Sequence, residues 1–406
     1  MKAYLRRGKK SKAIYYISFF LLIAAVIITV SVAILQNKNV QVSSKPPVAS
    51  KTAEASKTDA PKKESITILG VGDNLIHDVI YEQAERRTGK NGSYDFKPVY
   101  SHIANDIKNA DISVINQETP LATKIAQPSG YPRFNSPTQL GDDLVDLGFD
   151  VINHANNHIL DQNERGVAAT LDYWDTKPSV KVVGVYRDEE DLQNIRIVES
   201  KGIKTAHIGI TEMTNGLSLP KNSKYRLIYA DNTELIKKLI TKAKTMADVV
   251  VISAHWGNEN TYTLTDKQKN LAQNMVDWGA DIIFGNHPHV VQKLTVLERK
   301  DGTKCPVIFA LGNLVSAQQG GENMVGGMLT VTMTKDFSTN KTTYTDMKFK
   351  PIVTHYGPHC KDITIYPVSE YNDTLASKHG IRRFAPSFNL KFINNIIDKN
   401  IPKEYR

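Results

Sequence analysis

Cysteine is nearly absent from this sequence, which has only Cys305 and Cys360 among its 406 residues. Neither has a neighbouring cysteine at a metal-binding spacing, so a zinc site made of thiolates is excluded. One disulfide between them and two unpaired, buried thiols are both compatible with the sequence. The chain also lacks zinc-finger spacing, a basic-aromatic RNA-binding signature and internal repeats, and we expect no nucleic-acid partner.

Positive charge is in moderate excess, with a formal net charge of +9. Such an excess suggests a membrane surface, an anionic polymer or nucleic acid as partner. It is weak evidence for nucleic acid, because part of it lies in a short cluster at Lys2, Arg6, Arg7, Lys9, Lys10 and Lys12. The content of hydrophobic residues, 41%, and of charged residues, 23%, is typical of a protein with a globular core.

Residues 13–35 form an uninterrupted apolar run without a charged residue. About 20 such residues are enough to cross a bilayer as a helix. The cationic cluster precedes the run and only Lys38 closely follows it, so the positive-inside rule predicts a cytoplasmic amino terminus and an extracellular main domain. A cleaved signal peptide ending near Ser31-Val32-Ala33 is the alternative, but the run exceeds the usual length of about 7–15 residues. No cysteine follows the run, which excludes a lipoprotein anchor.

The sequence divides into five segments by composition. Residues 1–12 are a basic cytoplasmic segment and residues 13–35 the single transmembrane anchor. Residues 36–64 are rich in Lys, Ser, Ala, Thr, Val and Pro without periodicity, as in a disordered linker. Residues 65–366 are the folded domain, and residues 367–406, which have only short apolar runs, are a C-terminal tail.

Strand-like and helix-like patterns alternate in the domain, which predicts an α/β fold with βα units and a largely parallel sheet. The expected strands are 65–71, 112–115, 151–152, 182–183, 205–210, 249–253, 281–284 and 307–310. The expected helices are 94–109, 138–147, 163–174, 231–245 and 266–278. Residues 328–333 and 342–352 then resemble consecutive antiparallel strands, which suggests a second or mixed sheet packed on the first.

Polar side chains follow five of the expected strands. They are Asp73, Asn116 with Glu118, Asn157 with His158, His255, and His287 with His289. Functional groups of open α/β sheets gather beyond the carboxyl ends of the strands, so we expect these residues to form one site. Carboxylates, neutral imidazoles and an amide oxygen suit divalent Zn, Mn or Fe. Two such ions bridged by Glu118 could activate water, with His158 as general acid or hydrogen-bond donor.

Each of these residues also has an ordinary structural explanation. Asp73 could cap backbone amides at a turn, and Asn116 could brace a loop. Asp161 could cap the helix that begins near residue 164, and His255 could be a buried imidazole with a backbone partner. The recurrence of such residues at five successive strand ends is what favours a polar, metal-binding site.

Six motifs that contain these residues occur in an order that resembles a known family. They are Val71-Gly72-Asp73, Asn116-Gln117-Glu118-Thr119-Pro120, Ala155-Asn156-Asn157-His158 with Asp161, His255-Trp256-Gly257-Asn258-Glu259, Gly285-Asn286-His287-Pro288-His289-Val290 and Leu311-Gly312-Asn313. Together they resemble the CapA/PgsA family of poly-γ-glutamate capsule-synthesis proteins over residues 65–352. The family is similar to calcineurin-like metallophosphoesterases, which implies an α/β/β/α sandwich. Its members are typically membrane-anchored with the domain outside.

The resemblance also implies roles for single residues. It implies that the metal ligands are Asp73, Glu118 (bridging), Asn157, His255, His287 and His289, that His158 is catalytic, and that Asn116, Asn156, Asp161, Glu259 and Asn313 support the site. The sequence departs from the patterns of these two families at three places, which implies that one metal position is weaker. Position 75 is leucine instead of the phosphoesterase histidine, the second motif has Glu118 preceded by the amides Asn116 and Gln117, and position 286 is asparagine where many capsule relatives have histidine.

Three functions follow as hypotheses. The first is synthesis or export of an anionic capsule polymer such as poly-γ-glutamate, with other capsule-synthesis membrane proteins as partners. The second is metal-dependent hydrolysis of a phosphate ester at the cell surface. The third is a non-catalytic scaffold that uses the crevice to hold a ligand.

Overall fold

The structure is a computed structural model that describes residues 63–406. The predicted anchor at 13–35 and nearly all of the predicted linker lie outside the described residues. The last two residues of that linker, Lys63 and Glu64, are already part of the first strand. Within residues 63–406, no helix is both long enough and apolar enough to cross a membrane.

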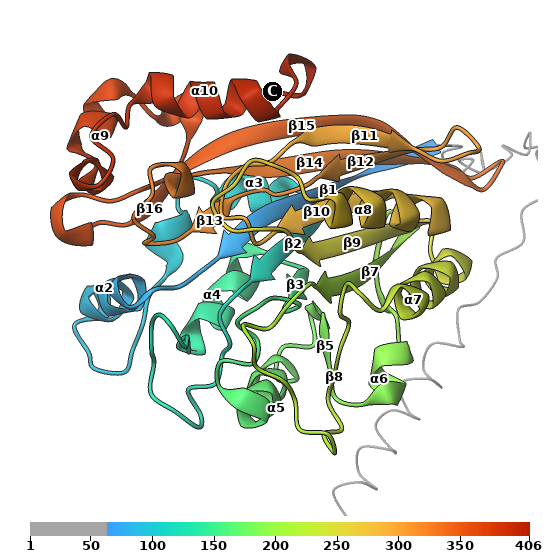
Figure 1. Ribbon diagram of the computed structural model, residues 1–406, viewed down its shortest axis with the longest axis horizontal. Helices are drawn as coiled ribbons and strands as arrows, with labels where there is room; N and C mark the ends of the chain where they lie inside the picture. The colour runs from blue at the N-terminus through green and yellow to red at the C-terminus, as the bar shows by residue number, and fades with distance from the viewer. Residues whose placement is uncertain (1–62) are drawn as a thin grey trace, which may run out of the picture. The chain divides into compact units, whose positions relative to one another are not determined.

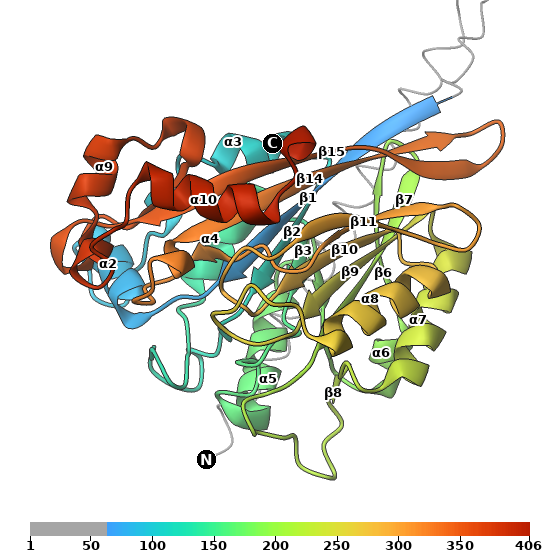
Figure 2. The ribbon, with the colours of Figure 1, turned by 45° about the horizontal axis from the view of Figure 1, so that its top comes forward.

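The domain contains two mixed β-sheets and a small third one (Figures 1 and 2). The first sheet has the spatial order β16 (Thr364–Pro367), β15 (Lys341–His355), β14 (Val325–Asp336), β1 (Lys63–Asn74), β2 (Ile112–Gln117), β3 (Val151–Asn153) and β4 (Lys181–Val183), and β13 (Asn313–Val315) pairs with the end of β1. The second sheet has the order β11 (Leu294–Glu298), β12 (Lys304–Ile308), β10 (Ile282–Asn286), β9 (Val249–His255), β7 (Ile203–Thr211) and β6 (Arg196–Ser200). Two short strands, β5 (Val185–Tyr186) and β8 (Arg226–Leu227), pair with each other.

Helices cover the outer faces of the two sheets. Those longer than one turn are α2 (Asp78–Thr88), α3 (Ala104–Asn109), α4 (Gln139–Leu147), α5 (Asn163–Trp174), α6 (Glu189–Gln193), α7 (Thr233–Met246), α8 (Asp266–Trp278), α9 (Asp373–Lys378) and α10 (Leu390–Asn400). In both ribbon views α7 and α8 lie along the second sheet, and α10 lies beside β14 and β15 (Figures 1 and 2). Helix α8 begins with a capping box between Thr265 and Gln268, which satisfies backbone N–H groups that have no partner inside the helix.

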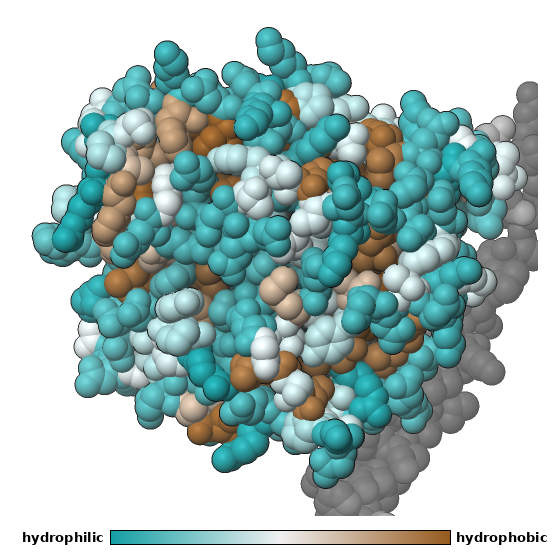
Figure 3. All heavy atoms as spheres, in the orientation of Figure 1, coloured by the Kyte–Doolittle hydropathy of each residue, from teal (hydrophilic) through white to brown (hydrophobic). Residues whose placement is uncertain are grey.

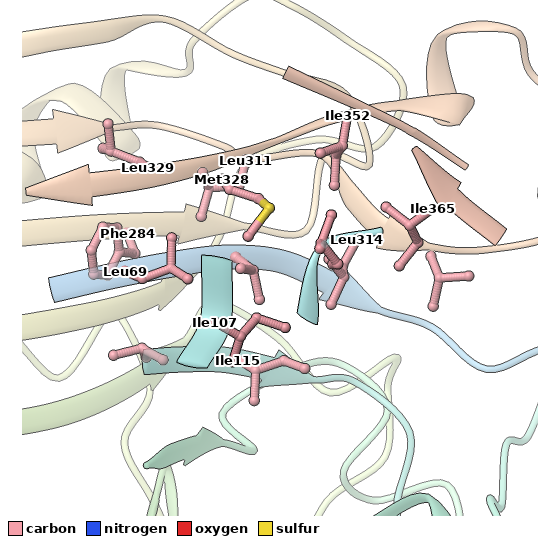
Figure 4. Packing of buried hydrophobic residues seen from close by; sticks show 14 of the residues in the cluster. Leu69, Ile107, Ile115, Phe284, Leu311, Leu314, Met328, Leu329, Ile352 and Ile365 are labelled. Atoms are coloured by element: carbon pink, nitrogen blue, oxygen red, sulfur yellow. The ribbon is translucent and has the colours of Figure 1, made fainter. Parts of the chain in front are cut away.

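The central strands are apolar on both faces because each face packs against a different layer. On β9, Val249 and Val251 belong to the core between the two sheets, whereas Val250 and Ile252 pack in the cluster that contains the buried face of α7 and α8. Figure 4 shows Phe284 of β10 beside Leu69 of β1, from the opposite sheet. The periodicity of two along a strand therefore explains the continuous apolar runs in the sequence.

The close approach of the sheets depends on Gly70. A β-carbon at this position would lie 2.5 Å from Cδ1 of Phe284, closer than carbon atoms can pack. Glycine therefore leaves room for an aromatic ring between the sheets. The face seen in Figure 3 is mainly hydrophilic with small separate hydrophobic patches.

The prediction of an α/β fold with parallel βα units is confirmed, and helices α5 and α8 have the expected bounds. Two local predictions were wrong. The expected helix at 94–109 is interrupted: a 3₁₀ turn at Lys97–Tyr100, with Pro98 in it, precedes the short α3. Helix α2, which directly follows the first strand-end motif, was not predicted.

The predicted second sheet at 328–352 is also placed differently. Strands β14 and β15 extend the first sheet, because β14 pairs antiparallel with β1 from Lys63 to Val71. The second sheet instead consists of strands from the middle of the chain. Pairing partners far apart in the sequence leave no local signal, which is why the order of strands could not be predicted.

Residues 367–406 pack on the domain. Ile393 and Ile397 of α10, with Phe388 and Ile381, are buried in the main core cluster. Both cysteines are free thiols: Cys305 is buried, and Cys360 is half-buried. The structure therefore contains no disulfide between them, and of the two alternatives it shows the unpaired thiols.

Candidate metal centre

Strand register brings the predicted ligands of the two sheets to one end of the domain. In the first sheet Asp73 pairs with Asn116 of β2 and with Asn313 of β13. Asn116 in turn pairs with Asn153 of β3. In the second sheet His255 at the end of β9 pairs with Asn286 at the end of β10. The carboxylates therefore come from one sheet and the imidazoles from the other.

The predicted ligand atoms lie within a few ångströms of one another. Oε1 of Glu118 is 3.6 Å from Nε2 of His255 and 3.8 Å from Nε2 of His289. Nδ1 of His289 is 3.1 Å from Oδ2 of Asp73. All six predicted ligands are at most 2% exposed: Asp73, Glu118, Asn157, His255, His287 and His289.

Three overlapping groups of side chains could each hold a metal ion, because the ligand atoms in each lie within 4.8 Å of one another. They are Glu118–His255–His287, Asp73–Glu118–His289 and Glu259–His287–His289. Glu118 belongs to the two groups that are fully buried. Glu259, by contrast, is exposed at the rim.

Side-chain amides orient the ligands. Nδ2 of Asn116 donates to Oδ1 of Asp73 at 2.7 Å, and Nδ2 of Asn153 donates to Oδ1 of Asn116 at 2.8 Å. Oδ1 of Asn157 lies 2.9 Å from Nε2 of His255. Oδ1 of Asn313 lies 2.9 Å from Nδ1 of His289. The last contact leaves Nε2 of His289 as the ring atom that faces Glu118. Hydrogen bonds of this kind fix the ring orientation of a ligating histidine.

The backbone around the ligands is locally constrained. A β-carbon on Gly72 would lie 1.9 Å from the carbonyl oxygen of Gly312, so only glycine lets β1 and β13 meet directly before Asp73. His287 and His289 have φ angles of 96° and 56°, in the left-handed region that non-glycine residues rarely adopt. This conformation lets the backbone N–H of His287 donate to Oδ2 of Asp73 at 3.2 Å. Such strain is typical of functional sites.

Burial controls the charge of the cluster. Burial, and then the neighbouring Asp73, raises the pKa of Glu118 well above its usual value. Burial, and then His287, lowers the pKa of His255 well below its usual value. Burial, and then His289, lowers the pKa of His287 to about 3. His255 and His287 are therefore neutral imidazoles, the form that binds metals.

His289 differs from the other two histidines. Burial opposes its protonation, but Glu118 and then Asp73 outweigh that effect and raise the pKa of His289 to about 10. Because a ligating histidine must be neutral, a cation that bound here would compete with a proton for this ring.

The residues present fit a divalent cation. Within the described part of the chain, both carboxylate oxygens of Glu118 are buried without a hydrogen-bond partner, and so are Nδ1 of His287 and Oδ1 of Asn286. Buried polar atoms are rarely left without partners, and a carboxylate costs more than a neutral group. A cation held by Glu118 and His287, which belong to one ligand group, would supply a missing partner to both side chains. Leu75, two residues after Asp73, is a buried apolar side chain and offers no ligand.

His158 lies beside this cluster and is held in one orientation. Its Nδ1 is 2.8 Å from Oδ2 of Asp161, which also accepts the backbone N–H of Phe134 at 2.7 Å. The ring of His158 packs edge-to-face on Phe134 with centroids 4.7 Å apart. Oδ1 of Asn156 accepts the backbone N–H of His158 at 3.0 Å. With Nδ1 engaged, Nε2 is the ring atom available to a ligand.

The structure thus brings all the predicted site residues to one region, with Glu259 at its exposed edge. Two further residues outside the predicted set lie beside the site. Asn153, which the sequence favours as a loop-bracing amide instead of a ligand, braces Asn116. The ring of His77 packs edge-to-face on Phe134, the same ring that contacts His158, with centroids 5.2 Å apart. His77 belongs to none of the six motifs, and only the folded chain brings it close to His158.

A family model described as bacterial capsule synthesis protein PGA_cap matches residues 67–318. The chain belongs to this capsule-synthesis family. The matched range contains every predicted ligand, from Asp73 to His289, and ends just after the Leu311-Gly312-Asn313 motif.

Two similar proteins are named for capsule or PGA biosynthesis. Capsule biosynthesis protein CapA of Bacillus anthracis is 30% identical over 268 residues, which are 63% of this chain and 61% of that protein. PGA biosynthesis protein CapA of Bacillus subtilis (strain 168) is 28% identical over 273 residues, which are 65% of this chain and 68% of that protein. The chain thus spans about three fifths to two thirds of the length of these relatives.

Solved structures with a similar arrangement are more distant. A phosphatase from Mycoplasma pneumoniae covers 71% of this chain and 94% of its own, with a TM-score of 0.43 and 15% identity. The NAD nucleotidase NadN of Haemophilus influenzae covers 84% of this chain and 60% of its own, with a TM-score of 0.46 and 12% identity.

Proposed function

We propose that this protein acts at the cell surface in the synthesis or export of an anionic capsule polymer, such as poly-γ-glutamate, through a site of the calcineurin-like metallophosphoesterase type. Membership of the capsule-synthesis family supports the process. The charge-free run at 13–35 supports a single-pass anchor with the domain outside, where it would meet other capsule-synthesis membrane proteins.

The observation that carries the proposed site is the buried Glu118 carboxylate, which lacks a hydrogen-bond partner and belongs to two ligand groups at once. One metal position would use Glu118, His255 and His287, with Asn157 beside His255. The other would use Asp73, Glu118 and His289. The second is the weaker one, because Leu75 supplies no further ligand. The donor set suits Mn, Zn or Fe.

A divalent cation held here would polarise an ester oxygen and lower the pKa of water. The protein's own residues would do the rest. His158, fixed by Asp161, would hold or release a proton at Nε2 towards a leaving group. Asn116 and Asn313 would keep Asp73 and His289 in place. Burial would exclude bulk water and strengthen each electrostatic contact.

Two measurements test this proposal. The full chain, purified in detergent, should contain Mn, Zn or Fe in stoichiometric amounts. Deletion of the gene in a host that makes a surface polymer should reduce that polymer. A metal-free preparation that cannot be loaded, or unchanged polymer in the deletion strain, would contradict the corresponding half of the proposal.

Hydrolysis of a phosphate ester is a second candidate, favoured by the His158–Asp161 pair beside the ligands. A generic phosphodiester, bis(p-nitrophenyl) phosphate, should then be turned over by the loaded protein and much more slowly by His158→Ala. Equal turnover by the two proteins would exclude a role of His158. If Glu118→Ala still supports polymer formation in cells, the third candidate holds instead, and the crevice serves as a non-catalytic scaffold.

A further inference from the structure

Two pockets lie one after the other beside the metal centre, and Tyr262 lines both. The first has a volume of about 440 Å³ and is lined mainly by side-chain amides: Asn260, Gln318, Gln319 and Asn323, with Tyr262, Gly320 and Glu322. Side-chain amides both donate and accept hydrogen bonds. This pocket therefore suits an uncharged polar group such as an amide or a hydroxyl.

The amide pocket is joined to the metal centre by hydrogen bonds. Nδ2 of Asn323 donates to the carbonyl oxygen of His289 at 3.2 Å and to Oδ1 of Asn260 at 2.7 Å. Nδ2 of Asn313 donates to Oε1 of Gln318 at 2.8 Å, while its Oδ1 contacts Nδ1 of His289. A ligand in the pocket would thus lie next to the ligands of the second metal position.

The second pocket has a volume of about 470 Å³ and is cationic. Its charged lining residues are Lys293, Lys399, Lys403 and Arg406, with Asp398 as the acid. Asp398 forms an ion pair with Arg406. Within residues 63–406, Lys293, Lys399 and Lys403 form no ion pair, and all three are exposed. An acidic group would complement this excess of positive charge.

Tyr262 stands between the two pockets. Its hydroxyl is buried and has no hydrogen-bond partner among the described residues. Nζ of Lys399 lies 5.3 Å from the ring centroid, within cation–π distance. Burial, and then Glu322, raises the pKa of Tyr262, so the hydroxyl keeps its proton and remains a donor. A buried hydroxyl without a partner is costly, and a rotation of Tyr262 towards a ligand that spans both pockets would give the hydroxyl an acceptor.

We propose that the two pockets form one groove that binds a linear anionic polymer, with an uncharged polar link in the amide pocket and acidic groups on the lysines of the second pocket. This inference rests on the proposed function and identifies where the polymer lies. It also gives residues 367–406 a role, because Lys399 and Lys403 come from α10 and the turn after it. The acidic group is a carboxylate or a phosphate, which both pair with lysine.

Binding of short oligomers to the full chain in detergent tests this groove. Three probes of equal length are compared by calorimetry: an oligomer of γ-linked glutamate, an oligomer of glycerol phosphate, and a neutral chitin oligomer. We expect one acidic oligomer to bind, with an affinity that falls as salt is added because salt screens exposed charges, and the chitin oligomer to bind at least tenfold more weakly. The acidic oligomer that binds identifies carboxylate or phosphate as the recognised group.

Variants assign the binding to the groove. The double variant Lys399→Glu, Lys403→Glu should bind the acidic oligomer at least tenfold more weakly, whereas Lys348→Glu, an exposed lysine on β15, should bind as the wild type does. Tyr262→Phe should bind severalfold more weakly. Equal affinity of the double variant and the Lys348 control, or no binding of either acidic oligomer to the wild type, would overturn the groove.

Metal content is measured on the same samples, which separates the two proposals. Bound metal without oligomer binding refutes the groove and leaves the metal centre intact. Oligomer binding that depends on Lys399 and Lys403 in a protein that cannot be loaded with metal supports the groove and refutes the metal centre.

Discussion

Replacement of Glu118 by glutamine should have opposite effects on stability without and with metal. In the metal-free protein the Glu118 carboxylate is buried, lacks a hydrogen-bond partner and lies close to Asp73. An unsatisfied buried polar group costs about 1–3 kcal/mol, and more when charged. Glutamine keeps the shape and cannot ionise, so folding no longer has to bury a charge or take up a proton there; we expect metal-free Glu118→Gln to be more stable by about 2 kcal/mol, a rise of roughly 3 °C in Tm for a domain of this size.

With metal, the order should reverse. A ligand at 100 times its dissociation constant stabilises the folded state by about 2.7 kcal/mol. Because Glu118 belongs to both buried ligand groups, the variant should lose most of this gain. Thermal unfolding followed by circular dichroism, after chelation and again after addition of Mn²⁺ or Zn²⁺, measures both effects. Glu199→Gln, at an exposed position on β6, is the control with the same change of charge.

The effect without metal should also depend on pH. The pKa of Glu118 is raised on folding, so above the ordinary pKa of about 4.3 the folded state holds a proton that the unfolded chain releases. The contribution of this group to the free energy of unfolding therefore falls as pH rises. The difference in stability between the wild type and Glu118→Gln should be small near pH 4 and largest at neutral pH. Equal stabilisation of wild type and variant by metal would refute Glu118 as a ligand.

Three other predictions concern separate parts of the molecule. If the site hydrolyses phosphodiesters, Asp161→Asn should lower turnover about 100-fold, since it removes the negative charge beside Nδ1 of His158 and replaces one acceptor oxygen with an NH2 donor, while metal content by elemental analysis stays the same; a loss of metal would contradict this assignment. Gly70→Ala should cost about 1–3 kcal/mol in urea unfolding, because the new methyl group would overlap Phe284, and Phe284→Leu in the same chain should recover part of it; an additive loss would argue against the overlap. His379 is buried, and its pKa is lowered to about 3, mainly by burial and then by His355, so the unfolded chain binds protons there below pH 6.5 and stability falls. At pH 5 the loss is about 2 kcal/mol, which should appear as lower hydrogen-exchange protection factors in α10 than at pH 7, after correction for the slower intrinsic exchange at pH 5; unchanged protection factors would speak against it.

Most strands and the position of the site could be predicted from local patterns. The runs before Asp73, Glu118 and His255 are apolar on both faces, and each ends in a polar donor. Since the carboxyl ends of parallel strands share an edge, proximity of the donors within each sheet followed without knowledge of strand order; that the donors belong to two different sheets was not predicted. The metal-binding and catalytic roles of these residues stay predictions.

What could not be predicted depends on contacts between distant residues. The pairing of β1 with β14 joins residues 63–71 to residues 328–336, and nothing in either segment indicates the partner. The same holds for Asn313, which reaches His289 only because β13 pairs with the end of β1. Helix α10 was missed although Ile393, Ile396 and Ile397 have helical spacing and are buried in the main core cluster.

The division of the donors between two sheets has a mechanical consequence. The carboxylates of Asp73 and Glu118 lie at the ends of strands of one sheet, and the three histidines lie at the ends of strands of the other. A bound ion would therefore link the two sheets at one end. Any sliding of one layer over the other would stretch coordination bonds on both sides. Metal affinity should therefore change when residues packed between the two sheets are substituted, even Gly70, which contacts no ligand. Chelation should in turn loosen that end of the sandwich first.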